Sequence, residues 1–516
     1  MPLAFTLDGR RVEVDDDGSS LLEVLRDRLH ARSAKDGCSP QGQCGCCTVL
    51  VDGQPRVACV TPARRVEGRT VTTLDGLDEA DRERWADGFL ACGASQCGFC
   101  TPGIIVRLNA LGPQPSRDRV EQALLAHLCR CTGWQTIVDA ATGSVEHTAV
   151  EHTAADRDLD AAASRATIEG GTPQVVSRDV VLGRAGFADD TAPRDSLVAV
   201  PSATAPGEWV VAETLADARR LAGKVQGRRT TIPPTPPLAL PPGDWDVRLR
   251  TTWVEPGYLE PDASWCEPGG DPFTPLANGG AFGGKVRSVA PDAARRLADD
   301  HGRPVRVVLA REDVVRLGPK RPPIAAGLRR DGTGIIRVVR THGIAEAIHA
   351  VLPDVEVEEV DVAGPPTSTD LRAAGWAEAA ILRAALDADP SIAAPNGSSA
   401  SAVVDAGGTV RIAVRCGRPL DTTVLRSYCI GAAHMALGWV RSEGIAVDAD
   451  GGIHDLTIRS FGILRAKDTP RIVVDIDDAD GSEPVNGSDA VFVAVAAAAW
   501  KAAGYPPDWP IEKGRA

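Results

Sequence analysis

Ten of the 13 cysteines fall between Cys38 and Cys131, and eight of these form two sets of four. The spacings are Cys38-x5-Cys44-x2-Cys47-x11-Cys59 and Cys97-x2-Cys100-x28-Cys129-x-Cys131. Four thiolates that converge on one small volume bind iron–sulfur clusters or zinc. An odd cysteine count, with no basic-then-apolar export signal at the N-terminus, argues against a disulfide framework. We therefore predict metal centres in a reducing, cytoplasmic compartment.

Three thiols of the first set lie in a loop that also carries Gly37, Gly42 and Gly45, and the fourth, Cys59, comes from the facing hairpin. The glycines let the loop fold back with its amides toward the sulfurs. Plant-type [2Fe–2S] ferredoxins use the spacing C-x4-C-x2-C plus a distant cysteine. One extra residue separates Cys38 from Cys44 here, which leaves Cys46 as an alternative ligand. The second set fits either an iron–sulfur cluster or a structural Zn(Cys)4 site between two helices.

Residues 1–78 read as a β-grasp domain. A hairpin is predicted by the alternation at Leu3–Leu7 and the Asp8-Gly9 turn, and Ser20–Glu23 is a capping box that opens a helix. A second hairpin is predicted from Thr48–Val51, Asp52-Gly53 and Arg56–Val60. Gly and Cys residues between helix and hairpin form the loop that presents the first set.

Helical periodicity follows over residues 79–141, with Gly103–Leu111 and Arg119–Cys129 as its clearest segments. Residues 142–171, rich in Ala, Asp and Thr, read as a linker. Beyond them the pattern is α/β. The expected strands are Val305–Leu309, Ile335–Val339 and Ile472–Ile476. The expected helices are Asp292–Asp300, Ala373–Leu386 and Ala494–Ala503. The fold class is therefore a multidomain α+β protein with a β-grasp [2Fe–2S] domain, a helical-bundle [2Fe–2S] domain and an α/β region.

Residues 1–140 resemble the iron–sulfur region of the xanthine dehydrogenase/aldehyde oxidase/CO dehydrogenase family of molybdenum hydroxylases. The resemblance is carried by Gly37–Val49, by Gln96–Gly103 and by Leu128–Trp134. It implies two [2Fe–2S] clusters, with the helical one nearer the molybdenum cofactor. It also implies that Gln96 approaches the pterin of that cofactor.

The second half resembles the same family in patches. Residues 172–345 look like its hammerhead and first molybdopterin domains, and residues 346–516 like a truncated second one. Asn278–Lys285, with Gly280, Phe282 and Gly283, looks like a pterin-side loop, and Asp370–Gly375, with Arg372, like the turn near the substrate. The loop also matches most of a P-loop, but Val286 stands where Ser or Thr would bind Mg²⁺, so a plain Gly-rich turn remains an alternative.

Two departures from the family pattern concern catalysis. No Gly-Gln-Gly segment that would hold the pterin occurs, and Ser488-Asp489 stands where the family has its general-base Glu. Asp489 is the one substitute the sequence offers. The resemblance thus implies that a molybdopterin-type cofactor belongs to a partner chain more than to this one.

The remaining features narrow the function classes. The net charge is −14, which disfavours nucleic acid as a partner, and no apolar run approaches the length of a membrane span. His434 is predicted to be a packed helical histidine, and Cys266, Cys416 and Cys429 to be buried thiols. We expect the electron-transfer component of a molybdenum hydroxylase. It would act with a molybdenum-containing catalytic subunit and with a flavin subunit or another acceptor. The alternative is a redox scaffold or sensor with a non-catalytic molybdopterin-like half.

Overall fold

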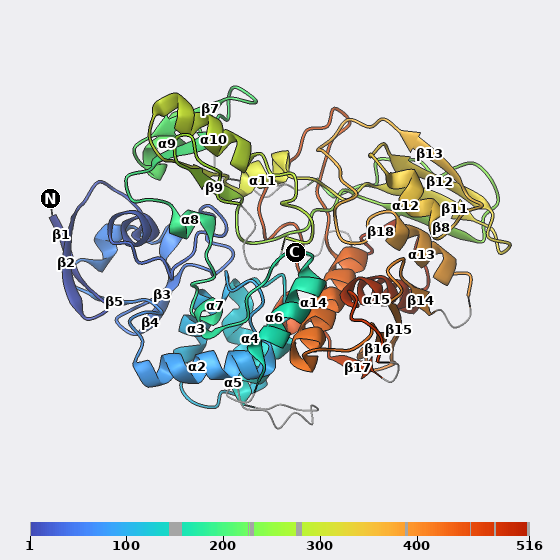
Figure 1. The fold of residues 1–516 in the computed structure, drawn as a ribbon, viewed down its shortest axis with the longest axis horizontal. Coiled ribbons are helices and arrows are strands. Elements are labelled where there is room, and N and C mark those ends of the chain that lie inside the picture. Colours follow the sequence, from blue (N-terminus) through green and yellow to red (C-terminus); the bar gives the residue numbers. More distant parts are fainter. Residues whose placement is uncertain are drawn as a thin grey trace.

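The computed structural model describes residues 2–143, 157–224, 227, 232–274, 281–387, 391–454, 456–478 and 481–512. The N-terminal sheet lies at one end of the molecule, and the sheet that contains β8, β11, β12 and β13 lies at the other (Figure 1). Among the described residues, none of the helices combines the length and hydropathy needed to cross a membrane.

The predicted β-grasp domain is a five-stranded mixed sheet in the order β2-β1-β5-β3-β4. Its strands are β1 (Pro2–Leu7), β2 (Arg10–Asp15), β3 (Thr48–Val51), β4 (Gln54–Val57) and β5 (Thr70–Thr72). The capping box is confirmed, since the Glu23 N–H donates to Ser20 Oγ at 3.3 Å and the Ser20 N–H to Glu23 Oε2 at 2.8 Å. It opens α1 (Leu21–Glu23), which continues as the π-helical turn η1 (Val24–Arg28).

Two details of this domain differ from the sequence prediction. The strand expected over Arg56–Val60 ends at Val57, and the chain then turns through the 3-10 segments η2 (Ala58–Val60) and η3 (Ala63–Val66). Strand β5 was not predicted, because three residues carry too little periodicity. It nevertheless lies at the centre of the sheet, between β1 and β3.

The helical region contains α2 (Glu79–Cys92), α3 (Thr101–Asn109), α4 (Arg117–Ala123), the 3-10 segment η4 (Leu124–Ala126) and α5 (Gln135–Thr142). The helix predicted over Arg119–Cys129 therefore ends early. Cys129 lies in the loop between η4 and α5, where the backbone is free of helical geometry and can turn thiols toward α3.

The linker predicted over 142–171 is wrong for its second half, and its residues 144–156 lie outside the described chain. Helix α6 (Leu159–Gly170) packs on α14 (Thr422–Arg441). Ala162 and Ala166 permit this close contact with Val424 and Tyr428. The composition suggested little to bury, but Arg165 and Glu169 of α6 are buried as an ion pair of 3.1 Å.

The rest of the chain forms three sheets, in the orders β7-β6-β10-β9, β13-β12-β11-β8-β18 and β14-β15-β16-β17. Their strands are β6 (Leu197–Pro201), β7 (Trp209–Ala212), β8 (Val247–Thr251), β9 (Ala263–Cys266), β10 (Val305–Val308), β11 (Ile324–Leu328), β12 (Gly334–Val339), β13 (Glu356–Val360), β14 (Ile392–Ala393), β15 (Ser399–Val404), β16 (Val410–Arg415), β17 (Ile472–Asp477) and β18 (Asp508–Trp509). The helices are α7 (Arg178–Val181), α8 (Ala188–Thr191), α9 (Leu215–Leu221), α10 (Ala290–His301), α11 (Arg311–Leu317), α12 (Ile344–His349), α13 (Trp376–Ala384), α14, α15 (Ser488–Ala502) and the 3-10 segment η6 (Ala466–Asp468).

The predicted strands and helices of this half are confirmed, with ends shifted by a few residues. The division at residue 345 differs from the structure. The second of these sheets contains β8, β11 and β12 from one side of that boundary and β13 and β18 from the other. Residues 172–345 and 346–516 thus share a sheet.

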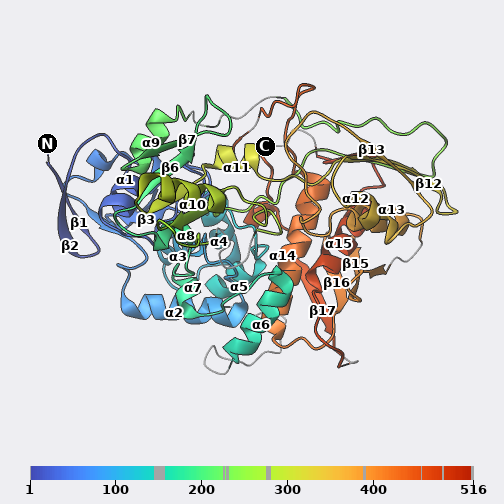
Figure 2. The same ribbon diagram turned by 45° about the horizontal axis from the view of Figure 1, so that its top comes forward.

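Helix α14 connects the cysteine-bearing half to the C-terminal half. It packs against α15, α6 and α2 and lies between the helical region and the strands β14–β17 in both views (Figures 1 and 2). Trp439 of α14 stacks on Phe492 of α15 with ring centroids 5.3 Å apart. The prediction that His434 packs within a helix is confirmed, as are the buried thiols at Cys266, Cys416 and Cys429.

His434 gives the fold an acid-sensitive position. Burial lowers its pKa from 6.5 to about 4, and its Nε2 lies 3.0 Å from the Leu464 carbonyl oxygen. Below pH 6.5 the unfolded chain takes up a proton that the folded chain excludes, so stability falls as the pH drops toward 4. We expect proton uptake by His434 in the unfolded chain to lower the free energy of unfolding by about 2 kcal/mol as the pH falls from 7 to 5. Denaturant titrations at both pH values should show a smaller loss for His434→Gln, and an equal loss would contradict the assignment.

Candidate metal centres

The first set of cysteines converges in the structure. Cys38, Cys44, Cys47 and Cys59 are all buried. The Cys38 thiol contacts those of Cys44 and Cys59, and Cys59 also contacts Cys47. Backbone amides support them, with the Gln41 N–H 3.2 Å from Cys38 Sγ and the Cys59 N–H 3.4 Å from Cys47 Sγ. Such N–H groups stabilise the thiolate form that binds iron.

The loop absorbs its extra residue through left-handed backbone at Gly42 (φ 69°). A Cβ at this glycine would lie 2.9 Å from Val60 Cγ1, so the loop also approaches the chain after Cys59 closely. Cys46 is oriented differently from Cys38. Its Sγ lies against Gly37, and of the four thiols it contacts that of Cys44. The arrangement favours Cys38 as the fourth ligand.

This arrangement predicts that Cys46→Ala leaves the β-grasp cluster intact, because the other four thiols form the group without it. Paramagnetic resonance of the reduced protein should show an unchanged signal. The matched variant Cys38→Ala should lose that signal. If Cys46→Ala loses it and Cys38→Ala keeps it, the ligand assignment is the reverse.

The second set also converges. Cys97 Sγ lies 3.5 Å from Cys131 Sγ, and the Cys100 thiol contacts that of Cys129. Cys100 immediately precedes α3, whereas Cys129 and Cys131 lie before α5. Contact with the Cys100 thiol, together with hydrogen bonds from Thr132 and Cys131, lowers the pKa of Cys129 to about 6. Cys129 is therefore prepared to bind metal as a thiolate.

The second set is arranged as two pairs of thiols, Cys97 with Cys131 and Cys100 with Cys129. In the first set the four thiols form one connected group, in which Cys38 contacts Cys44 and Cys59, and Cys59 contacts Cys47. Among the described residues, no three His, Cys, Asp or Glu side chains are grouped so that they could hold a single metal ion. A Zn(Cys)4 site requires four sulfurs around one ion. Two pairs suit a two-iron cluster, in which each iron takes two thiolates.

The two sets are joined through the backbone. The Leu128 N–H donates to the Cys44 carbonyl oxygen at 2.9 Å, and Cys129 is the next residue. Helix α3 approaches the first loop at Gly103, where a Cβ would lie 2.3 Å from the Gly45 carbonyl oxygen. A ligand of one set is thus one hydrogen bond away from the residue preceding a ligand of the other.

Three of the residues predicted on the molybdopterin side come together. Arg372 Nε lies 2.9 Å from Asp489 Oδ1, and its guanidinium lies 4.8 Å from the centre of the Phe282 ring. Gly283 (φ 86°) lies beside them at a close backbone approach, since a Cβ there would be 1.8 Å from the Asp370 carbonyl oxygen. Gly280 lies outside the described residues. Gln96 donates from Nε2 to Ser427 Oγ of α14 at 3.0 Å.

Sequence reasoning missed the buried charges around the second set. Arg130, between Cys129 and Cys131, pairs bidentately with Glu443 and donates from Nε to the Pro256 carbonyl oxygen at 2.7 Å. Lys285 and Glu260 form a second buried pair of 2.9 Å, and burial raises the pKa of Glu260 to about 7. The Cys-Arg-Cys sequence was a signal for Arg130, but nothing local identified Glu443.

Ser488 and Asp489 are also engaged by neighbours. Ser488 Oγ accepts from Arg372 Nη2 at 3.0 Å, and the Gly487 and Ser488 N–H groups donate to the Glu169 carboxylate at 3.1 and 2.9 Å. Glu169 of α6 thereby caps the start of α15. Asp489, the substitute for the family's Glu, is paired with Arg372.

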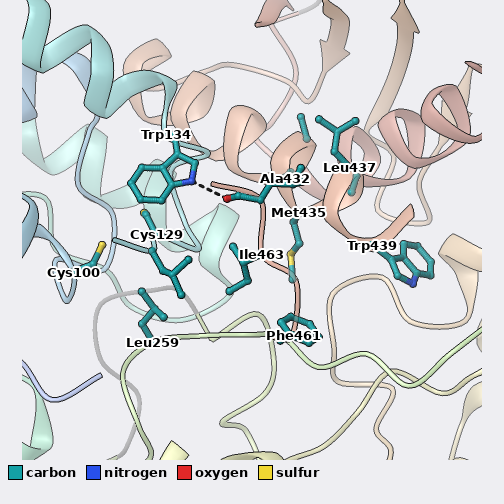
Figure 3. Packing of buried hydrophobic residues seen from close by; sticks show 14 of the residues in the cluster. Cys100, Cys129, Trp134, Leu259, Ala432, Met435, Leu437, Trp439, Phe461 and Ile463 are labelled. Carbon is teal, nitrogen blue, oxygen red and sulfur yellow. Dashed lines mark hydrogen bonds between the residues drawn. The ribbon is translucent and has the colours of Figure 1, made fainter. Parts of the chain in front are cut away.

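The space near these residues is small. The cavity lined by Cys97, Cys100 and Cys131 measures about 10 Å³, and that beside Arg372 and Phe282 about 20 Å³. Each has room for about one water molecule. Side chains such as the buried Trp134, whose indole N–H donates to the Leu464 carbonyl oxygen at 3.0 Å, fill the surroundings (Figure 3). Neither of these two cavities, in the described part of the chain, is large enough for a molybdopterin.

Comparisons with known proteins agree with the two centres. The family described as 2Fe-2S iron-sulfur cluster binding domain matches residues 5–74, which contain the first set. The family described as [2Fe-2S] binding domain matches residues 73–142, which contain the second. The prediction of two [2Fe–2S] clusters is confirmed, and the zinc alternative for the second set is not supported.

Relatives match the same part of the chain. A probable xanthine dehydrogenase subunit of Bacillus subtilis is 40% identical over 124 residues, which are 23% of this chain and 71% of the relative. The nicotinate dehydrogenase small FeS subunit of Eubacterium barkeri is 38% identical over 140 residues, which are 26% of this chain and 88% of the relative. The aldehyde oxidoreductase structure from Desulfovibrio gigas aligns with 96% of this chain and 97% of its own, with a TM-score of 0.68 and 14% identity. That likeness shows a shared multidomain α+β fold.

Proposed function

The chain belongs to the molybdenum hydroxylase family of xanthine dehydrogenase and aldehyde oxidase, and from this we propose that it is the electron-transfer component of such an enzyme. It is an oxidoreductase of that family with two [2Fe–2S] clusters. Electrons would enter at the Cys97/Cys100/Cys129/Cys131 centre and leave from the Cys38/Cys44/Cys47/Cys59 centre.

One observation carries this proposal: the peptide hydrogen bond that joins the two sets of thiols. Cys44 and Cys129 hold different centres, and the Leu128 N–H on the Cys44 carbonyl oxygen links their backbones. A [2Fe–2S] cluster, when bound, carries one electron at a time. The thiolates hold the centres, and the buried surroundings exclude water.

The electron donor we propose is a molybdenum centre in a companion chain. Two features support this. The cavities beside the second set admit about one water each, and Asp489 is paired with Arg372 rather than available as a base. The relatives include the small FeS subunit of nicotinate dehydrogenase and the small subunit of nicotine 6-hydroxylase. The acceptor would be a flavin-containing subunit or another carrier, and the cytoplasmic location stays a prediction.

Metal analysis of the chain produced alone tests the proposal. We expect four iron and four acid-labile sulfide per chain, as two [2Fe–2S] clusters require, and no stoichiometric molybdenum. Adding an aldehyde or a purine should leave the visible absorbance unchanged. About one molybdenum per chain, with bleaching by substrate, would contradict the proposal and make Asp489 the first residue to mutate. Stoichiometric zinc without visible absorbance would contradict the clusters themselves.

The filled cavities also favour the second candidate, a redox scaffold or sensor whose molybdopterin-like half only docks partners. The two candidates differ in one respect. A sensor changes state with the redox poise of its surroundings, whereas an electron-transfer component is reduced by the substrate of its companion. Reduction of the clusters by the substrate of the companion chain, measured with and without that companion, separates the two candidates.

A further inference from the structure

A surface hollow adjoins the first metal centre. It measures about 490 Å³ and is lined by residues from β3, β4, the two 3-10 segments that follow β4 and the turn before β5, among them Arg56, Val60, Arg65 and Arg69. Val60 directly follows the ligand Cys59, and its side chain is close to Gly42 of the ligand loop. The hollow thus lies over the outward side of this centre.

The hollow is basic, although the chain carries a net charge of −14. Residues 52–69 contain four arginines and two acidic residues. Arg69 pairs with Asp52 at 2.6 Å. In the described part of the chain, no carboxylate lies within ion-pair distance of Arg56, Arg64 or Arg65, and all three are exposed. Many other arginines, including Arg28, Arg84 and Arg303, are paired.

The lining of the hollow also contains the apolar residues Val51, Val60 and Val66. Val60 is 58% exposed, one of the highest values among large hydrophobic side chains, while Cys59 beside it is 5% exposed. A surface that combines an exposed apolar side chain with exposed arginines is typical of a protein–protein interface. Redox partners meet through small interfaces of this kind, in which complementary charge steers the encounter.

We propose that an acidic electron-carrier protein docks on this hollow, with its apolar contact on Val60 and its carboxylates against Arg56 and Arg65 of the lining and against Arg64, the exposed chain neighbour of Arg65. The inference rests on the proposed electron-transfer function and names the partner chemistry at its exit. One electron passes from the reduced β-grasp centre to the carrier, whose oxidised cofactor gains it. No bond forms or breaks.

Stopped-flow mixing of the cluster-loaded, dithionite-reduced chain with two haem carriers tests the docking. The probes are an acidic c-type cytochrome and the basic mitochondrial cytochrome c, and both accept one electron as ferric haem becomes ferrous. At low ionic strength we expect the acidic carrier to react faster, and salt to slow it. The variant R56E/R64E/R65E should slow the acidic carrier by about 10-fold or more and should speed the basic one.

The matched control is R330E/R383E/R411E, which reverses three exposed arginines on the C-terminal half. It changes net charge equally and should leave both rates near those of the unaltered chain. Unchanged rates in R56E/R64E/R65E, with both cluster signals present, would overturn the docking surface and leave the proposed function standing. If that variant does not fold, the salt dependence of the unaltered chain decides. The proposal is overturned if added salt does not lower the rate of electron transfer from the unaltered chain to the acidic carrier. An unaltered chain that reduces neither carrier would overturn both.

Discussion

Cys129→Ser is expected to abolish the paramagnetic signal of the helical-domain cluster and to retain that of the β-grasp cluster. Cys129 contacts Cys100, and the cluster needs both of them as thiolate ligands. A serine hydroxyl stays protonated at neutral pH and does not replace the thiolate. The ligands of the other cluster all come from residues 38–59, so they keep their geometry. Paramagnetic resonance of the dithionite-reduced variant measures both signals, and Cys97→Ser should behave in the same way.

The control for this experiment is Cys429→Ser. Cys429 is fully buried in α14 and belongs to neither set, so both signals should persist. Loss of both signals in Cys129→Ser would mean that the two cluster domains unfold together. The structure provides a route for that outcome, since the β-grasp and helical regions contribute to one continuous hydrophobic cluster.

Glu443→Gln is expected to lower the unfolding free energy by about 3–5 kcal/mol, because it leaves the Arg130 guanidinium buried without its counter-charge. The side chains of Arg130 and Glu443 are 1% and 0% exposed. Arg130 lies between two cluster ligands, so the uncompensated positive charge should also raise the reduction potential of the helical-domain cluster. Denaturant unfolding and a redox titration followed by paramagnetic resonance measure the two effects.

A surface pair provides the comparison. Glu213 pairs with Arg303 at 2.8 Å, but the two side chains are 69% and 43% exposed. Water screens such a pair, so Glu213→Gln should change neither stability nor potential measurably. If Glu443→Gln is as silent as this control, Arg130 gains its stability from the Pro256 carbonyl and the Phe461 ring rather than from Glu443.

The cysteine centres were predictable from the sequence because their ligands are close together along it. Cys38, Cys44 and Cys47 lie on one loop, and the pairs Cys97/Cys100 and Cys129/Cys131 each lie on one short segment. Spacing alone still left zinc and Cys46 as alternatives. The orientation of the Cys46 thiol toward Gly37, and the pairing of the others, are tertiary features.

What the sequence did not predict depends on contacts between distant segments. Glu443 meets Arg130 across 313 positions, and β18 joins β8 across the whole C-terminal half. Helix α6 looked like a linker because its buried face consists of small alanines and an internal ion pair. The resemblance did identify Phe282, Arg372 and Asp489, which the fold brings together, whereas the role of Gln96, which donates to Ser427, stays a prediction.

The central claim is that this chain receives electrons from a companion molybdenum chain. Its most direct measurement is the rate of cluster reduction after substrate is mixed with the two chains together, followed by paramagnetic resonance of rapidly frozen samples. The account predicts no reduction by an aldehyde or purine without the companion. With the companion present, both clusters should be reduced, and with Cys129→Ser the β-grasp cluster should stay oxidised or be reduced far more slowly. Substrate-driven reduction of the isolated chain, or undiminished β-grasp reduction in Cys129→Ser, would contradict it.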